Sequence, residues 1–231
     1  MKLILILTIN LGLAAAALAQ TKTAQVSALE GTATKARGSA QASPLKTGAG
    51  LAQGDIVETG DDSRIEIKFS DASVLRMGSK ARLQLTDVHF GGAAKRKMTA
   101  KLFFGNLWAK VTSVIHGEQK FQVETENAVA GVRGTTFRVD ARTDKSVLVR
   151  VFAGTVAVAK NVPIYATGKP GEQRHEVSGP EEVSREQWEK LVGKQMQILI
   201  AADGTPGDPE PIAGEDDAFA KWNQQRDDAG K

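Results

Sequence analysis

The amino-acid sequence predicts an all-β protein, a sandwich-, barrel- or roll-like domain of short strands followed by a small helical C-terminal appendage. Between residues 23 and 160, short segments alternate apolar and polar side chains, which is the period of strands with one buried face. Turn-forming clusters of Gly, Asp and Ser separate these segments. Strands at this spacing, without intervening helices, favour an all-β sandwich, barrel or roll.

The first twenty residues have the layout of a secretory signal peptide. Lys2 precedes an apolar run that ends in "ALA" just before Gln20. A positive start, an apolar stretch and small residues two apart predict cleavage after Ala19. The alternative is an uncleaved anchor helix, because the stretch approaches membrane-spanning length. No later segment is apolar enough to span a bilayer, so we expect a periplasmic or secreted protein with at most peripheral membrane contact.

The chain divides into three predicted parts: a signal peptide (1–19), a β domain (20–165) and a C-terminal extension (166–231). Within the β domain, alternation is clearest in "RIEIKF" (64–69) and "SVLVRVF" (146–152). In addition, "EGTATKA", "FGNLWAKV" and "AGTVAVAK" each place a glycine before an alternating strand. Their spacing is unequal, so they predict a fold that reuses one strand–turn unit rather than a strict repeat.

The extension begins with a Gly- and Pro-rich connection. A helix is then predicted over 179–194, because Trp188, Leu191 and Val192 fall on one helical face. The segment "MQILIA" (196–201) predicts a short strand.

The last residues, "EDDAFAKWNQQRDDAGK", have two possible forms. They either form a short helix that docks on the domain through Phe219 and Trp222 or remain a disordered acidic tail. Residues 20–170 carry 22 Lys and Arg against 13 Asp and Glu, whereas residues 171–231 carry 7 against 14. A basic body and an acidic tail either attract each other or leave the body free to bind polyanions.

No pattern of catalytic or metal-binding residues is evident. His89, His116 and His175 are far apart, without the spacing of a helical metal site. Asp61 and Asp62 lie in "TGDDS", which predicts a polar turn rather than a calcium loop. There is no G-x-S-x-G elbow and no cysteine. We therefore expect neither an enzyme nor a bound cofactor or metal.

The stretch "AVAGVRGTTFRVD" (128–140) places Arg133 between Gly131 and Gly134. An alternating strand follows the glycines, which disfavours a phosphate-binding loop because that needs a helix start. The glycines predict a corner between two strands. At such a corner we expect the guanidinium of Arg133 to donate hydrogen bonds to carbonyl oxygens or to a carboxylate. The alternative role for this arginine is recognition of a partner.

The densest basic run consists of Lys95, Arg96 and Lys97, with Lys101 shortly after. Such a run is typical of a solvated strand edge that blocks aggregation. The functional alternative is contact with a polyanion, either a cell-wall polymer or anionic lipid. Nucleic acid is not an expected partner of an exported protein.

Several of these motifs together resemble the FecR-domain family, the extracytoplasmic domain named after the ferric citrate regulator. The resemblance extends over residues 24–160 in "GDIVETGDDSRIEIKFSDASVLRMGSKARLQL", "LFFGNLWAKV", "FQVETENAVAGVRGTTFRVD" and "VFAGTVAVA". The most recognisable motif is centred on Arg133, Gly134 and Thr135, with Phe137 following. The sequence departs from the family at Ala72, where members commonly have Gly in an Asp-Gly turn, which leaves the turn type there open.

This resemblance implies a periplasmic all-β domain that serves signalling or protein contacts and has no catalytic activity. Regulators of this type carry a cytoplasmic sigma-regulating segment and a transmembrane helix before the domain. Here the corresponding place holds the signal-peptide pattern, so we do not expect the direct sigma-factor role. We expect an interaction, sensing or scaffold module whose partner is another envelope protein, paired through exposed strand edges.

Overall fold

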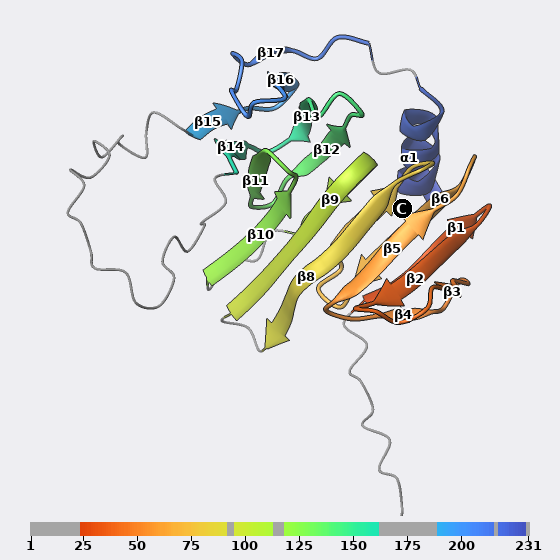
Figure 1. The fold of residues 1–231 in the computed structure, drawn as a ribbon. Coiled ribbons are helices and arrows are strands. Elements are labelled where there is room, and N and C mark those ends of the chain that lie inside the picture. The colour runs from red at the N-terminus through yellow and green to blue at the C-terminus, as the bar shows by residue number, and fades with distance from the viewer. Residues whose placement is uncertain (1–23, 92–94, 113–117, 162–188, 215–216, 230–231) are drawn as a thin grey trace, which may run out of the picture.

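The computed structural model of the protein describes residues 24–91, 95–112, 118–161, 189–214 and 217–229. In this part of the chain the strands form two sheets that share one long strand, β9 (Lys95–Lys110), and one helix, α1 (Ala218–Ala229), lies beside them (Figure 1). The prediction of an all-β fold with a small helical appendage is confirmed. None of the helical structure in these residues is long and apolar enough to cross a bilayer.

Both sheets are built mainly from antiparallel neighbours, and the pair formed by β9 and β10 is parallel. In spatial order the first sheet contains β4 (Gly50–Leu51), β1 (Ala24–Glu30), β6 (Arg64–Phe69), β7 (Val74–Met77), the second half of β9, β12 (Thr136–Ala141), β13 (Val147–Ala153), β16 (Met196–Ile200) and β17 (Glu210–Pro211). The second contains β3 (Ser43–Pro44), β2 (Ala33–Arg37), β5 (Asp55–Thr59), β8 (Arg82–Gly91), the first half of β9, β10 (Glu118–Glu124), β11 (Ala128–Val132), β14 (Val156–Lys160) and β15 (Glu189–Val192).

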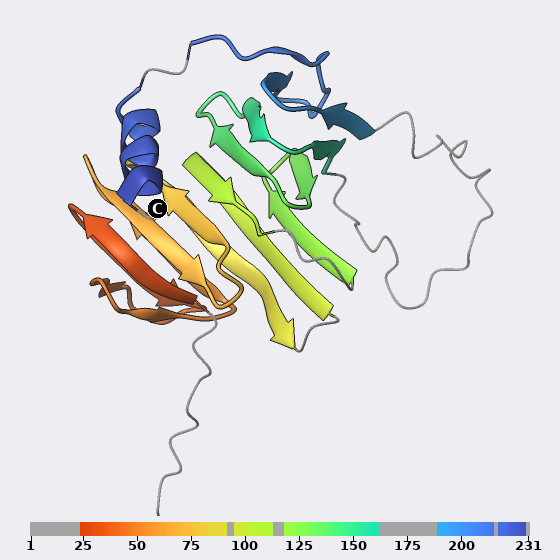
Figure 2. The ribbon, with the colours of Figure 1, turned by 180° about the vertical axis from the view of Figure 1, so that it is seen from behind.

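The long strand β9 joins the two sheets and the two halves of the chain. Earlier strands lie on one side of it and later strands on the other (Figures 1 and 2). β9 passes from one sheet to the other at Gly105, whose φ is +93°. A Cβ at this position would lie 2.5 Å from the Cα of Ala81 and 2.9 Å from the carbonyl oxygen of Lys80. Only glycine fits this bend without a shift of the backbone.

A single apolar core fills the space between the sheets. In β6, Ile65, Ile67 and Phe69 point into it, as the alternation of "RIEIKF" predicts. Phe137 of β12 is fully buried in the same cluster. Burying a side chain of this size stabilises a fold by about 1.5–3 kcal/mol, so this core supplies most of the stabilisation.

Glycines mark the places where the chain passes between the sheets. Each crossing whose residues the structure describes in full contains one: Gly31, Gly48, Gly54, Gly60, Gly78, Gly105, Gly134, Gly154 and Gly193. The hairpins that stay within a sheet at β6–β7 and β12–β13 contain none, whereas the within-sheet connections β2–β3 and β16–β17 contain Gly38 and Gly204 with Gly207. The recurring glycine-then-strand pattern in the sequence therefore corresponds to these crossings.

The helix predicted over 179–194 is wrong for its last part. Residues Glu189–Val192 form β15, which pairs with β14, while 179–188 lie outside the described residues. Leu191 is 67% exposed and Val192 is fully buried, which is the alternation of a strand rather than a shared helical face. Pairing with the open side of β14 outweighs the weak helix propensity of the segment. The strand predicted over 196–201 is confirmed by β16.

Candidate functional site

The outer face of the first sheet carries an aligned row of mostly polar side chains. Its members are direct register partners on successive strands: Glu66, Arg76, Trp108, Arg138, Arg150, Gln197 and Glu210. We call these residues the cross-strand row. Except for Glu210, whose two-residue strand is exposed, each member alternates along its strand with side chains that enter the core. Strand geometry therefore turns the row outward.

The end of the cross-strand row on β6 and β7 is buried although it is charged. Glu66 is 6% exposed and Arg76 is 3% exposed. Burying charges is costly unless they are paired. Here the Nε of Arg76 donates a hydrogen bond of 2.7 Å to Oε2 of Glu66, and the guanidinium lies 4.3 Å from the ring centre of Trp108. The pair and the aromatic ring together satisfy this arginine.

Two arginines face each other further along the row. Arg138 and Arg150 are direct partners across β12 and β13, an arrangement in which like charges repel. Asp140 bridges them by accepting bonds from Nε of Arg138 at 2.8 Å and from Nη1 of Arg150 at 2.6 Å. Burial by itself lowers the pKa of Arg138, but Asp140 and Asp217 outweigh it and raise that pKa. The guanidinium of Arg138 thus remains charged.

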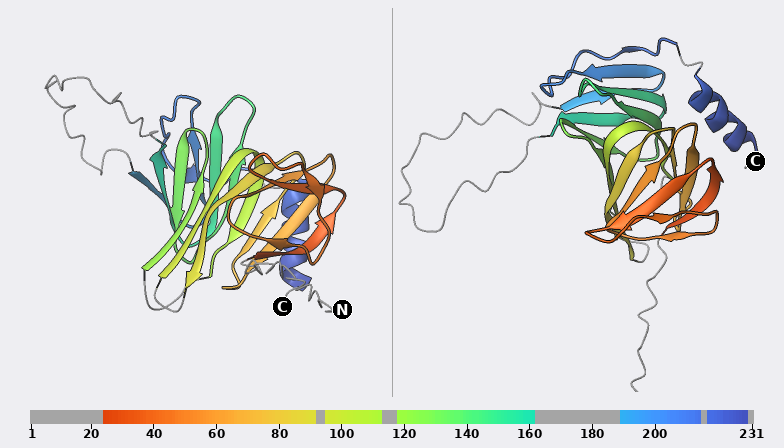
Figure 3. Two further views of the ribbon diagram at one scale, coloured as in Figure 1. Left: turned by 60° about the horizontal axis from the view of Figure 1, so that its bottom comes forward. Right: turned by 45° about the vertical axis from the view of Figure 1, so that its right-hand side comes forward.

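Helix α1 covers the row on the side of β1, β6 and β7 (Figures 1 and 3). Asp217 caps its first turn, because Oδ1 accepts a bond of 2.7 Å from the N–H of Ala220. Phe219 and Trp222, one turn apart, are buried with ring centres 6.3 Å apart. Together with Trp108 they form a cluster separate from the core. The alternative in which Phe219 and Trp222 dock on the domain is thereby confirmed.

Charged groups of α1 bind complementary groups of the row. Arg226 donates to Glu66 at 2.7 Å, and Asp227 accepts from Arg76 at 2.9 Å. Arg76 also donates to the carbonyl oxygen of Asn223 at 2.9 Å. These contacts hold the C-terminal half of the helix on β6 and β7.

Two further contacts fix the other parts of α1. The carboxylate of Asp217 lies 2.7 Å from Nη1 of Arg138, and the indole N–H of Trp222 donates to Glu30 of β1 at 2.6 Å. The helix is therefore anchored on β1, β6, β7 and β12 by bonds that involve charged groups. Such bonds are directional, so they select one position and orientation of the helix.

Glu66 is the electrostatic centre of this interface. Burial by itself raises the pKa of its carboxyl, but hydrogen bonds from Arg226, Ser27 and Arg76 outweigh that effect and lower the pKa from 4.5 to about 2. Glu66 therefore stays ionised at neutral pH and through most of the acidic range. Arg76 and Arg226 both form ion pairs with this negative charge.

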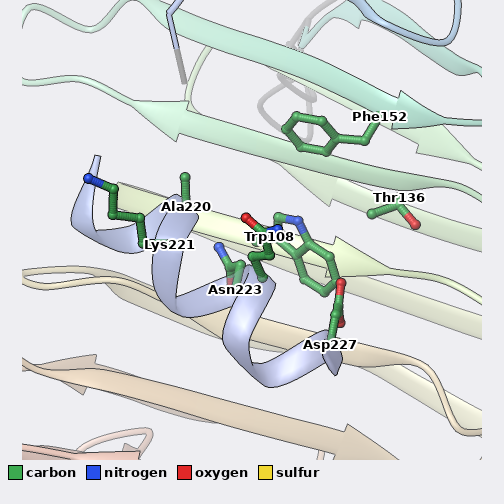
Figure 4. Close-up of a pocket in the computed structure, with 8 residues that line it drawn as sticks. Trp108, Thr136, Phe152, Ala220, Lys221, Asn223 and Asp227 are labelled. Carbon is green, nitrogen blue, oxygen red and sulfur yellow. The ribbon is translucent and has the colours of Figure 1, made fainter. Parts of the chain in front are cut away.

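A hollow of about 360 Å³ lies between α1 and the sheet (Figure 4). The side chains that line it are Trp108, Thr136 and Phe152 on the sheet and Ala220, Lys221, Asn223, Gln224 and Asp227 on the helix. Aromatic rings form its floor and polar groups of α1 form one wall. This lining suits contact with another side chain or backbone segment.

The predicted corner around Arg133 lies at one of the crossings between sheets. Gly134 has a φ of +60° between β11 and β12, whereas Gly131 lies inside β11 with ordinary strand geometry. Phe137 enters the core. The side chain of Arg133 is exposed, and no bond joins it to another described residue. The bond to corner carbonyls that the sequence predicted for Arg133 is thus not seen in the described part of the chain.

Thr135 makes the corner contacts instead. Its hydroxyl lies 3.1 Å from the carbonyl oxygens of both Arg133 and Thr155. A Cβ on Gly154, where φ is +83°, would lie 2.8 Å from that hydroxyl oxygen. The two Gly-Thr turns therefore pack directly on each other, which explains why both carry glycine.

The four basic residues near 95–101 do not form one cluster. Arg96 lies 3.7 Å from Asp71, Lys97 lies 2.5 Å from Asp87, and Lys101 lies 5.3 Å from the ring centre of Phe103. Alternation along β9 turns Arg96 and Lys97 to opposite sides. The side chain of Lys95 is outside what the structure describes. Each of the three described cations thus has a contact within the chain, and no observation favours a polyanion site here.

The structure also places the other histidines and aspartates that were considered as catalytic or metal-binding residues. His89 lies 2.6 Å from Asp87 on an exposed part of β8, and Asp61 and Asp62 lie in a turn. In the described residues, no three His, Cys, Asp or Glu side chains are grouped to hold a metal ion. His116, His175, Ala19 and Gln20 lie outside the described residues.

The comparisons with known proteins agree with the resemblance seen in the sequence. The family model described as FecR protein matches residues 55–157, so the resemblance to the FecR-domain family is confirmed over this segment. Strands β1 to β4 and the region from β15 to α1 lie outside it. No curated protein matches the chain.

Two solved structures show a partial similarity to the fold. Both are crystal structures of a candidate anti-sigma factor from Parabacteroides distasonis ATCC 8503, at 1.65 Å and 2.50 Å resolution. Each is 15% identical to this chain, with TM-scores of 0.48 and 0.49. The match covers 73% of this chain and 64% of theirs, so the chain spans less than two thirds of their length.

Sequence reasoning did not identify the cross-strand row. A signal for its members was present, because "IEI", "LRM", "LWA", "FRV" and "VRV" each place one outward residue between two core residues. Their alignment, however, depends on strand order and register, which the individual segments do not contain. The FecR match supports a signalling or sensing role for the β domain.

Proposed function

We propose that this chain, whose residues 55–157 match the FecR family model, is an exported, non-enzymatic interaction and sensing module of the cell envelope. The partner is another envelope protein. The observation that carries the proposal is the outer face of the first sheet, which holds a helix through buried ion pairs and aromatic contacts. The family match supports the regulatory role, and the N-terminal signal pattern supports export.

Docking on a face fits the structure better than pairing at a sheet edge. Three of the four outermost strands, β3, β4 and β17, have only two residues each, and β3 and β17 contain Pro44 and Pro211. Short, proline-containing edges offer few free backbone groups to an added strand. The fourth, β15, has four residues. We therefore assign partner binding to the α1 side of the first sheet.

Export is tested by fractionating the native cells and sequencing the N-terminus of the purified protein. We expect a processed protein outside the cytoplasm that begins at Gln20. An Ala19→Arg variant, which destroys the small-residue site, should accumulate unprocessed. An unprocessed wild-type protein found only in the cytosol would contradict the proposal.

Partner binding is tested by photo-crosslinking in intact cells. A photoreactive amino acid replaces Gln224, which lines the hollow beside α1, or Gln84, which faces outward on the second sheet as a matched control. We expect a discrete protein adduct from position 224 and a much weaker one from position 84. Equal adducts, or none from position 224, would argue against a binding site on this face.

A further inference from the structure

We propose that α1 is the internal occupant of a helix-binding site, and that a helix of the partner takes its place. The site consists of the cross-strand row from Glu66 to Arg138 together with Glu30. The helix it fits is amphipathic, with aromatic residues at positions i and i+3, a basic residue at i+7 and an acidic residue at i+8. The identity of the partner rests on the proposed function, but the site itself does not.

The first argument is that α1 is attached outside the core. Phe219 and Trp222 pack with Trp108 in a cluster of their own, with Phe152 at its margin. None of these four side chains belongs to the core between the sheets. Release of α1 therefore uncovers the outer face of the first sheet but leaves the core packing intact.

The second argument is that the internal helix fits its site imperfectly. Asn223 is 4% exposed, and neither polar atom of its side-chain amide has a hydrogen-bond partner among the described residues. A buried, unpaired amide opposes docking, because both of its polar atoms bond to water once the helix is released. A partner helix with a small apolar residue at this position avoids that penalty and so competes effectively with α1.

The third argument is that the released face is compatible with water. Glu66, Arg76 and Arg138 become solvated when α1 leaves, whereas a wholly apolar face would be prone to aggregation. The same charges then give the vacant site its selectivity. Glu66 requires a basic group and Arg76 an acidic group, at the spacing of Arg226 and Asp227.

The fourth argument is that part of the site is accessible before α1 leaves. The hollow of about 360 Å³ is lined by Phe152, which is only half-buried, and by Trp108, which is 5% exposed. An incoming aromatic side chain contacts this surface first. Exchange of helices then proceeds from a bound encounter complex rather than by waiting for full release of α1.

The test measures binding of a fluorescent peptide with the sequence of residues 216–231 to two purified full-length proteins. One is the wild type, and the other is the Phe219→Ala/Trp222→Ala double variant, in which the internal helix has lost its aromatic anchors. We expect the peptide to bind the double variant at least tenfold more tightly than the wild type, because α1 competes in the wild type. A control peptide with Arg226 and Asp227 exchanged has the same composition but places like charges on Glu66 and Arg76, and we expect at least tenfold weaker binding.

Three results would overturn the inference: no binding to a double variant that retains its strand circular dichroism, equal affinity for the two proteins, or equal affinity of the two peptides. Should the double variant fail to fold, hydrogen exchange of the wild type decides. We expect the amides of α1 to exchange at least tenfold faster than those of β6 and β12, whereas exchange together with these strands would reject a separable helix. Because both measurements use purified protein, they stand even if the chain proves not to be exported.

Discussion

The two faces of the first sheet are built from the same strands but hold their neighbours in different ways. In β6, Ile65, Ile67 and Phe69 enter a continuous apolar core, while Glu66 between them points to α1. Apolar burial is non-directional and large in sum. The buried ion pairs of the outer face add little net stability but depend strongly on geometry. The inner face therefore determines whether the domain folds, and the outer face determines where α1 docks.

The largest effect is expected from a deletion on the inner face. Phe137→Ala should lower the free energy of unfolding by about 3–5 kcal/mol, because it leaves a cavity in the core. Chemical denaturation followed by circular dichroism measures this loss. Phe152→Ala, on the outer face beside the hollow, is the matched control and should cost about 1 kcal/mol or less. Equal losses would show that the two faces do not differ as proposed.

Acid should weaken the outer face before the core. The pKa of Glu66 is about 2 in the folded protein and 4.5 ordinarily, so its contribution to docking is complete above pH 4.5 and is lost as the pH falls through about 2. Burial raises the pKa of Asp217, but bonds from the N–H of Ala220 and from Arg138 outweigh this and lower it, so Asp217 acts in the same direction.

The fluorescence of Trp108 and Trp222 during an acid titration measures this release. We expect a change below pH 4.5 while the strand circular dichroism is still intact. A Glu66→Gln variant should have lost most of this pH dependence. A single transition in which both signals change together would indicate that α1 and the core form one cooperative unit.

A smaller effect is expected from a backbone change that touches neither face. Ala72 connects β6 and β7 with a φ of +66°, where the FecR family commonly has glycine. Residues with a Cβ are strained in this region, so Ala72→Gly should raise the free energy of unfolding by about 0.5–1 kcal/mol. Ala157→Gly, inside β14, should lower it by a similar amount. A destabilised Ala72→Gly protein would mean that the turn differs from the Asp-Gly turn of the family.

The smallest effect on folding is expected at Arg133. Because its guanidinium is exposed and unbonded among the described residues, Arg133→Ala should change stability by less than about 0.5 kcal/mol. Thermal melting measures this change. A loss of about 1–3 kcal/mol would instead indicate bonds to buried acceptors. Unchanged melting with weaker partner capture would assign Arg133 to recognition.

The alternation in "RIEIKF" and "SVLVRVF" was sufficient to predict strands, because the period of two reflects which side chains enter a core. At Leu191 and Val192 the same kind of reasoning gave a helix, since a short segment does not contain the β14 edge that captures it. Arg133 and Gly131 were assigned to one corner by proximity in sequence, yet only Gly134 has the left-handed backbone. The cross-strand row depends on the pairing of seven strands, and that order is set by long-range packing.

The bond between Trp222 and Glu30 joins residues 192 positions apart in the chain. A ribosome has therefore made nearly all of the β strands before the residues that cover their outer face emerge. Until synthesis reaches α1, the row of charges therefore has no helix of its own chain to cover it. At that stage a helix of another molecule would meet no competition from α1, so the order of synthesis separates formation of the strands from covering of their outer face.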